Sequence, residues 1–254
     1  MTIGVLCHTF FGMQGLWEEK LSYLPFALAV PVVVVAIVVA TSGGPSVAES
    51  KSFSSAEKSA IRRTEALLAG IPQRGAALGD PKAPVTLQLF GDLQCAEVRQ
   101  VMLGAIPVLI RHWVRDGKLR IVYRSLQSDT HDGPEFREEH IAALAAGRQE
   151  KMWAFIDLFY REQQPVFTNY ADDAFLEGIA EQAGVELRSW SEERETEGWT
   201  RRIDADEALA SSKGFTLGLT PWFLIGPTGG ESRPLLHVSF QESKVFDEAI
   251  RGLL

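Results

Sequence analysis

A single cysteine at the start of a predicted helix is the residue of this chain best placed for chemistry. Cys95 follows the apolar segment 85–91 and a short turn, and the helix that begins after it would direct its free N–H groups toward the sulfur. Free N–H groups and the positive end of the helix dipole stabilise a thiolate, which is the reactive form of cysteine. The sequence therefore predicts a site for thiol chemistry at Cys95.

Two neighbours of Cys95 weigh against ordinary dithiol chemistry. The position three residues later, where a Cys-x-x-Cys motif has its second thiol, is Val98. Thiolate attack could form a mixed disulfide on Cys95, but Val98 could not break it. Glu97 places a carboxylate beside the thiol, which disfavours the thiolate and opposes the helix terminus. Three interpretations of Cys95 follow: a reactive monothiol, a redox-silent relic in a binding domain, or a structural or intermolecularly paired thiol.

The composition excludes several other classes of function. The 254 residues have a formal net charge of −8, which argues against nucleic acid as a partner. The two cysteines, Cys7 and Cys95, cannot build a disulfide framework. We find no motif for a cofactor or a metal and predict neither. Four histidines lack metal-ligand spacing and are expected at the surface or at helix ends: His112, His131, His140 and His237.

An apolar segment near the N-terminus predicts attachment to a membrane. Residues 24–41 lack charge and, with their flanks, reach the length of about 20 residues that a bilayer span needs. The alternative is a signal peptide cleaved after Ala40, which would give a secreted form, but the segment is long and residues 18–20 are a poor positive flank. Lysines on both sides leave the orientation undecided. Met13 is an alternative start to Met1.

The elements around Cys95 follow a βαβ…ββα order with a helical insertion. The helix after the first strand makes residues 85–123 a parallel βαβ unit, and the glycine-rich segment 226–232 joins the last two strands as a hairpin. We predict strands at 85–91, 119–125, 221–226 and 233–239, helices at 96–115 and 241–253, and a helical block at about 136–213.

Four parts of the chain differ in character. A tail (1–23) and the anchor or signal segment (24–41) precede a linker (42–77) and an α/β domain (78–254). The linker contains an amphipathic helix, because Ser54-x-x-Glu57 is a capping box that opens a helix to about Leu68. Within the helical block, aromatic residues recur at helical spacing and should form its core: Trp153, Phe155, Phe159 and Tyr160.

Four segments resemble the DsbA-like branch of the thioredoxin-fold family, which comprises extracytoplasmic thiol–disulfide oxidoreductases. They are LGDPKAPVTL at 78–87, FGDLQC at 90–95, AALAAGRQEKMWAF at 142–155 and GLTPWFLIG at 218–226. The resemblance covers about residues 78–253 and implies a thioredoxin-like α/β fold with an inserted helical subdomain. It also implies that the domain lies outside the cytoplasm.

The resemblance also implies a function and a set of site residues. A cis Thr220–Pro221 bond would lie beside Cys95 and offer backbone to an extended substrate. We therefore expect a membrane-anchored, monothiol thiol–disulfide oxidoreductase, with Cys95 as nucleophile and Thr220 and Pro221 as substrate-binding residues. Its partners would be thiols or disulfides of extracytoplasmic proteins, with an external thiol or reductase resolving the adduct. The alternative is a redox-silent peptide-binding or chaperone-like module.

Overall fold

The structure is a computed structural model that describes residues 52–130, 134–216 and 218–254. The predicted anchor at 24–41, the tail before it and Cys7 lie outside the described residues, so the predictions about them stay predictions. Within the described residues, no helix combines the length and the apolar character needed to cross a bilayer.

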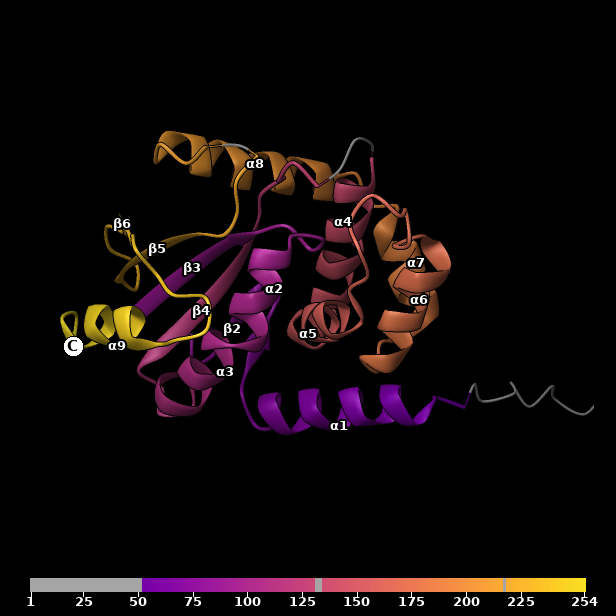
Figure 1. The fold of residues 1–254 in the computed structure, drawn as a ribbon, viewed down its shortest axis with the longest axis horizontal. Coiled ribbons are helices and arrows are strands. Elements are labelled where there is room, and N and C mark those ends of the chain that lie inside the picture. The colour runs from indigo at the N-terminus through magenta and orange to yellow at the C-terminus, as the bar shows by residue number, and fades with distance from the viewer. Residues whose placement is uncertain (1–51, 131–133, 217) are drawn as a thin grey trace, which may run out of the picture. The chain divides into compact units, whose positions relative to one another are not determined.

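A six-stranded sheet forms the centre of the α/β domain (Figure 1). Strands β3 and β4 pair in parallel, whereas the other neighbouring pairs are antiparallel, so the predicted βαβ unit and the later hairpin are both confirmed. The strand order is β1 (Gln73–Arg74), β2 (Ala77–Leu78), β4 (Leu119–Ser125), β3 (Val85–Gly91), β5 (Trp222–Pro227) and β6 (Arg233–Pro234). Cys95 follows β3, which lies between β4 and β5.

The two faces of the sheet differ because β3 alternates in polarity. Leu87 and Leu89 are buried in the main hydrophobic core, while Thr86 and Gln88 on the opposite face are half-buried. The core face packs against α2 (Ala96–Leu103), α3 (Ala105–Leu109) and α9 (Lys244–Arg251). The opposite face packs against α8 (Gly198–Ser212), whose Ala210 joins a smaller cluster with Phe90 and Leu224.

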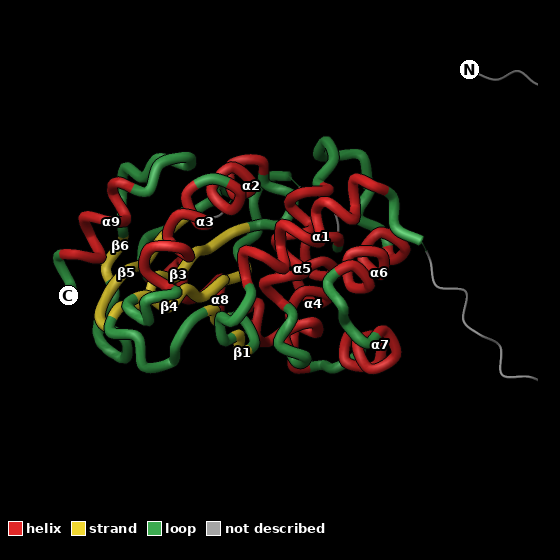
Figure 2. The backbone as a smooth tube through the Cα atoms, turned by 90° about the horizontal axis from the view of Figure 1, so that it is seen from below, coloured by secondary structure: helices red, strands yellow, loops and turns green. Residues whose placement is uncertain are grey.

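The predicted helical block is confirmed, and its helices before α8 lie toward the other end of the domain from β5 and β6 (Figure 2). Its helices before α8 are α4 (Glu135–Gly147), α5 (Met152–Glu162), α6 (Asp173–Gln182) and α7 (Leu187–Arg194). The four aromatic residues predicted as its core are all buried. Since α5 packs against both α2 and α4, the insertion lies directly beside the helix that follows Cys95.

The residues before β3 pack as part of this domain. Helix α1 (Ser55–Leu68) begins at the predicted capping box of Ser54 and Glu57. It packs against α5, where Thr64 donates a hydrogen bond to the buried Asp157. Strand β2 pairs with β4. Residues 55–77, which the sequence assigned to a linker, thus lie in the same compact unit as the α/β domain.

Three predicted elements are shorter or broken in the structure. The helix predicted at 96–115 breaks at Gly104 and continues as α3 and a π-helical turn (η1, Ile110–Val114). A side chain at Gly104 would clash with the carbonyl oxygen of Phe240, and Pro107 has no N–H for the helical ladder. The strand predicted at 233–239 ends at Pro234, and the last helix begins only at Lys244.

Candidate active site around Cys95

Cys95 is the N-cap residue of α2, at the end of a turn that follows β3. Its backbone N–H donates to the Asp92 carbonyl oxygen at 3.1 Å, which closes the turn. Helix α5 and the residue after it hold this turn from the side. The Tyr160 hydroxyl donates to the Asp92 carbonyl oxygen at 3.1 Å, and Gln163 Nε2 donates to the Leu93 carbonyl oxygen at 2.9 Å. The helical insertion thus positions the cysteine.

The three predicted site residues lie together. The peptide bond between Thr220 and Pro221 is cis, as the resemblance implies. Cys95 Sγ lies 3.5 Å from the Thr220 carbonyl oxygen and 3.2 Å from Glu97 Oε2. The single thiol proton can be donated to either oxygen. The sulfur is therefore flanked by the backbone of the proline loop on one side and by a carboxylate on the other.

Val98 occupies the second-thiol position with a fully buried hydrocarbon side chain. It packs against the end of β3, where a Cβ atom on Gly91 would lie only 2.8 Å from Val98 Cγ1. Within the described residues the sole cysteine is Cys95, and its thiol is free. The described part of the site therefore has one thiol beside a cis peptide bond, and a hydrocarbon side chain at the position three residues later.

The surroundings of Cys95 favour the neutral thiol. Cys95 is only 3 % exposed, and this burial raises the pKa of its thiol above the ordinary value. The hydrogen bond to Glu97 raises the pKa further. Contacts with Thr220 and with the backbone at Val98 and Glu97 lower it but do not offset the burial. The predicted competition between the helix terminus and Glu97 is thus settled mainly by desolvation.

A buried polar cluster that the sequence analysis did not predict lies behind the cysteine turn. Gln94 donates to Glu139 Oε1, and the Asp92 carboxylate accepts hydrogen bonds from Gln94 and Ser128. The Tyr123 and Tyr160 hydroxyls are 2.9 Å apart. These groups come from β4, α4 and α5 and from the loops after β3 and β4.

Burial controls the protonation of this cluster. It raises the pKa of Glu139 to about 9, assisted by the negative charge of Asp92, so Glu139 is protonated at neutral pH. Burial also raises the pKa of Tyr123 and of Tyr160 well above the ordinary range. Glu139, Tyr123 and Tyr160 behind the cysteine turn are therefore neutral at neutral pH.

His140 corrects one sequence-based expectation. We predicted a surface or helix-end histidine, but His140 is fully buried in α4. Its Nδ1 lies 2.8 Å from the Phe136 carbonyl oxygen and its Nε2 lies 3.3 Å from that of Gly91. The sequence held one signal for this burial, since Glu139 and His140 directly precede the apolar run 141–147. In the structure both residues are buried in the same helix as that run.

The family of this chain is shown by its match to a family model. A family model described as thioredoxin matches residues 73–227, which is more than half of the chain. No curated protein matches the chain.

Several solved structures share the fold. The structure of alpha-DsbA1 from Wolbachia pipientis has 21 % identity and a TM-score of 0.58, and the match covers 75 % of this chain and 94 % of that one. Oxidised BdbD from Bacillus subtilis has 16 % identity and a TM-score of 0.59, with coverage of 72 % and 96 %. A thioredoxin-like oxidoreductase from Silicibacter pomeroyi has 25 % identity and a TM-score of 0.54, with coverage of 74 % and 95 %. The match of the family model over residues 73–227 shows that the chain belongs to the thioredoxin family, and its fold is similar to that of DsbA proteins.

Proposed function

We propose that this chain is a membrane-anchored thiol–disulfide exchange protein that acts through one thiol, Cys95. The observation that best supports the proposal is the distance of 3.5 Å between Cys95 Sγ and the Thr220 carbonyl oxygen beside the cis bond to Pro221. An extended substrate that paired with the backbone at Thr220 would bring its own sulfur close to this thiol. The substrates would be disulfides of extracytoplasmic proteins.

The proposed reaction uses two exchange steps. The Cys95 thiolate attacks one sulfur of a substrate disulfide, so that a Cys95–substrate bond forms and the other substrate sulfur leaves as a thiolate. A thiol outside this motif then attacks the Cys95 sulfur or the substrate sulfur. If a different thiol of the substrate attacks the substrate sulfur, a new substrate disulfide forms and Cys95 leaves as a thiolate. If a small-molecule or protein thiol attacks the Cys95 sulfur, the substrate leaves with both of its thiols reduced and the attacking thiol stays joined to Cys95. A further external thiol then breaks that disulfide, which regenerates Cys95 and leaves the two external thiols joined as a disulfide.

The raised pKa of Cys95 determines the expected kinetics. At neutral pH the thiolate fraction is small, so attack is slow and becomes faster as the pH rises. A thiol of high pKa is also a poor leaving group, so the mixed disulfide should be long-lived. The proposed protein is therefore a slow exchanger that holds its substrate covalently until an external thiol arrives.

A second candidate function is a redox-silent peptide-binding module. It is favoured by the burial of Cys95 and by its hydrogen bond to Glu97, since both keep the thiol protonated. In this case the backbone at Thr220 would bind a peptide without covalent chemistry.

One experiment separates the two candidates. The full chain with Cys7→Ser is incubated with a peptide disulfide across a range of pH, and the mixed disulfide is measured by mass spectrometry against a Cys7→Ser/Cys95→Ser control. The exchange function predicts an adduct on Cys95 that forms faster as the pH rises. Peptide retention without an adduct, unchanged by Cys95→Ser, would establish the binding module instead. Absence of both would refute both candidates.

The location of the protein is part of the proposal. We infer a single span at 24–41 with the domain outside the cytoplasm, because the segment has the length of a bilayer span and the family resemblance places such domains there. Alkaline extraction of membranes and protease treatment of intact cells would test the two parts. Release by alkaline extraction or a cleaved N-terminus at Thr41 would argue for a secreted form, and protection from protease would argue for a cytoplasmic domain.

A further inference from the structure

The face of the sheet that lies opposite α2 carries a cavity of about 750 Å³. Its floor is formed by β3 and β4, which contribute Thr86, Gln88 and Arg120. Its walls are the β1–β2 hairpin, the end of α4, the start of α8 with the segment before it, and the β5–β6 turn. Cys95 is not among the lining residues, so this cavity is separate from the candidate active site. Its size is within the range of pockets that hold small organic ligands.

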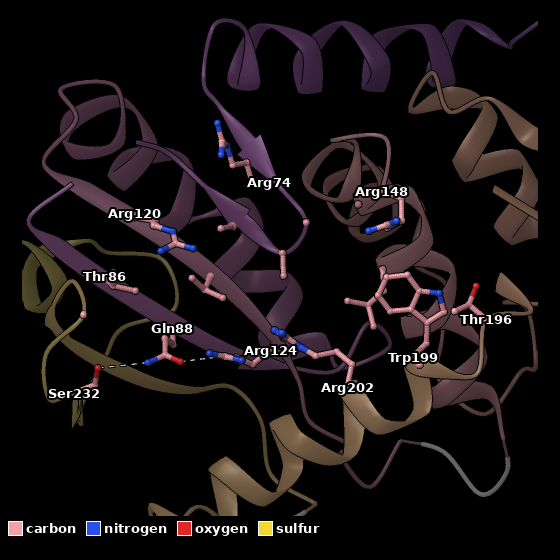
Figure 3. Close-up of a pocket in the computed structure, with 18 of the residues that line it drawn as sticks. Arg74, Thr86, Gln88, Arg120, Arg124, Arg148, Thr196, Trp199, Arg202 and Ser232 are labelled. Atoms are coloured by element: carbon pink, nitrogen blue, oxygen red, sulfur yellow. Dashed lines mark hydrogen bonds between the residues drawn. The ribbon is translucent and has the colours of Figure 1, made fainter. Parts of the chain in front are cut away.

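The cavity gathers positive charge in a chain whose net charge is −8. Five arginines line it, from β1, β4, α8 and the residue after α4, and Figure 3 shows them on several sides of the cavity: Arg74, Arg120, Arg124, Arg148 and Arg202. Glu193 is the single carboxylate among the described residues that line the cavity. A hollow lined mainly by one sign of charge concentrates the field and attracts ions of the opposite sign.

The internal ion pairs neutralise only part of this charge. Arg124 pairs with the buried Asp206 at 2.7 Å, and Arg148 Nε lies 3.5 Å from Glu193 Oε1. Arg202 Nε is buried without a hydrogen-bond partner and lies 3.5 Å from Asp206 Oδ2.

Two arginines have no acidic partner at all in the described part of the chain. Arg74 and Arg120 make no ion pair and no side-chain hydrogen bond there. Guanidinium groups form paired hydrogen bonds with phosphate and carboxylate groups. The unpaired arginines therefore offer donors to an anion that the chain does not itself supply.

The other lining groups indicate an organic ligand rather than a bare ion. Trp199 lines the wall, and its indole is fixed because Nε1 donates to the Glu193 carbonyl oxygen at 2.9 Å. Val122 and Leu144 add apolar surface. On the floor, Gln88 is hydrogen-bonded to both Arg124 and Ser232 and so fixes the Arg124 guanidinium (Figure 3). The site combines a fixed aromatic ring with cationic groups on several sides.

We propose that this cavity, named here the arginine cavity, binds a small organic molecule with at least two phosphate or carboxylate groups. The free guanidinium groups of Arg74 and Arg120 bind one anionic group, and those of Arg148 and Arg202 bind another beside Trp199. The site lies across the sheet from Cys95, and binding there does not depend on the thiol.

Calorimetric titration of the full chain with pyrophosphate and with citrate tests the proposal. The two probes distinguish phosphate from carboxylate ligands, and an oligoglutamate peptide is titrated beside them. We expect saturable binding of one molecule of pyrophosphate or citrate, weakened by salt. The double variant Arg74→Gln/Arg120→Gln should bind at least about tenfold more weakly, because it loses charge-assisted hydrogen bonds. Glu193→Gln should bind more tightly.

A matched double variant controls for net charge. Arg62→Gln/Arg111→Gln removes the same charge from two exposed arginines outside the cavity and should leave binding unchanged. Circular dichroism would verify that all variants fold. Equal weakening in both double variants would mean non-specific attraction and would overturn the proposal. Binding of the peptide alone would identify an acidic protein segment as the occupant, and binding of no probe would leave no anion site; either result also overturns it.

Discussion

The two faces of the sheet differ in the charged groups that they carry. On the α2 face, Cys95 is buried beside Glu97, and burial keeps Glu139 behind it neutral. On the α8 face, five arginines surround a cavity that admits solvent. A cationic neighbour is what lowers the pKa of a reactive thiol. Among the described residues the hydrogen-bond partners of the Cys95 sulfur are Glu97 and Thr220, neither of them a cation, so the proposed anion site and the thiol do not share their arginines.

The largest expected effect comes from completing the α2 face. Val98→Cys places a second thiol at the position that now holds a hydrocarbon, and a cysteine is smaller than the valine that packs on Gly91. The introduced thiol can attack the Cys95 sulfur and release the substrate. Because this step is intramolecular, we expect the mixed disulfide to decay roughly a hundredfold faster or more. Mass spectrometry of the adduct over time measures it.

Val98→Ala is the control for that variant, since it shortens the side chain without adding a thiol. A lifetime unchanged by Val98→Cys would mean that the two positions cannot approach, and the geometry inferred for the site would be wrong.

The second prediction concerns the buried ion pair that joins α8 to strand β4. Asp206 on α8 is buried, pairs with Arg124 and accepts the Ser125 N–H. Asp206→Ala leaves the guanidinium without its partner and should lower the free energy of unfolding by about 3 kcal/mol. Denaturant titration measures this.

Asp204→Ala on the same helix is the matched control. Asp204 is exposed and pairs with Arg137, so its removal should change stability by less than about 1 kcal/mol. Equal effects of the two variants would show that the buried pair does not anchor α8.

The third prediction concerns pH. The pKa of Glu139 is about 9 in the folded protein against an ordinary value of 4.5, so the folded state binds this proton more tightly than the unfolded chain. Its contribution to stability therefore falls as pH rises from about 4.5 to about 9. Glu139→Gln retains the acceptor for Gln94 and cannot ionise. Its stability relative to the wild type should increase across this range in urea titrations, and a pH-independent difference would contradict the assignment.

The smallest expected effect is on the thiol itself. Glu97→Gln removes one of the causes that raise the pKa of Cys95, whereas burial, the larger cause, remains. The pKa should fall and the rate of alkylation at neutral pH should rise. Thiolate absorbance against pH, with Cys95→Ala as the blank, measures the change. Glu65→Gln, an exposed change on α1, should have no effect.

The sequence was sufficient for elements with long periodic patterns. The strands at 85–91 and 119–125, the capping box at Ser54 and the helical block each carry several residues of consistent signal, and all are confirmed. Strands β1 and β2 have two residues each, which is too short to show an alternating pattern of polar and apolar residues. Strand β6 stops early because the chain turns after Pro234, and His237 has a positive φ of 57°.

The candidate site was predictable where its residues are adjacent in sequence or carry a motif. Cys95 and Glu97 are neighbours, and the Thr-Pro segment is a family motif. The burial that raises the pKa of Cys95 was not predictable, because it depends on packing by residues that are distant in sequence, such as Thr220. The arginine cavity was hidden for the same reason, since its five cations are scattered from Arg74 to Arg202 and an acidic total charge masks them.

Valine at position 98 also determines what this domain can contribute to its surroundings. A pair of thiols stores two electrons when reduced and releases them when it closes into a disulfide. The described part of the chain has one thiol, so it has no such store. Under the proposed function, Cys95 would relay exchange between other thiols, and more copies of the protein would change how fast a compartment equilibrates without changing its redox capacity.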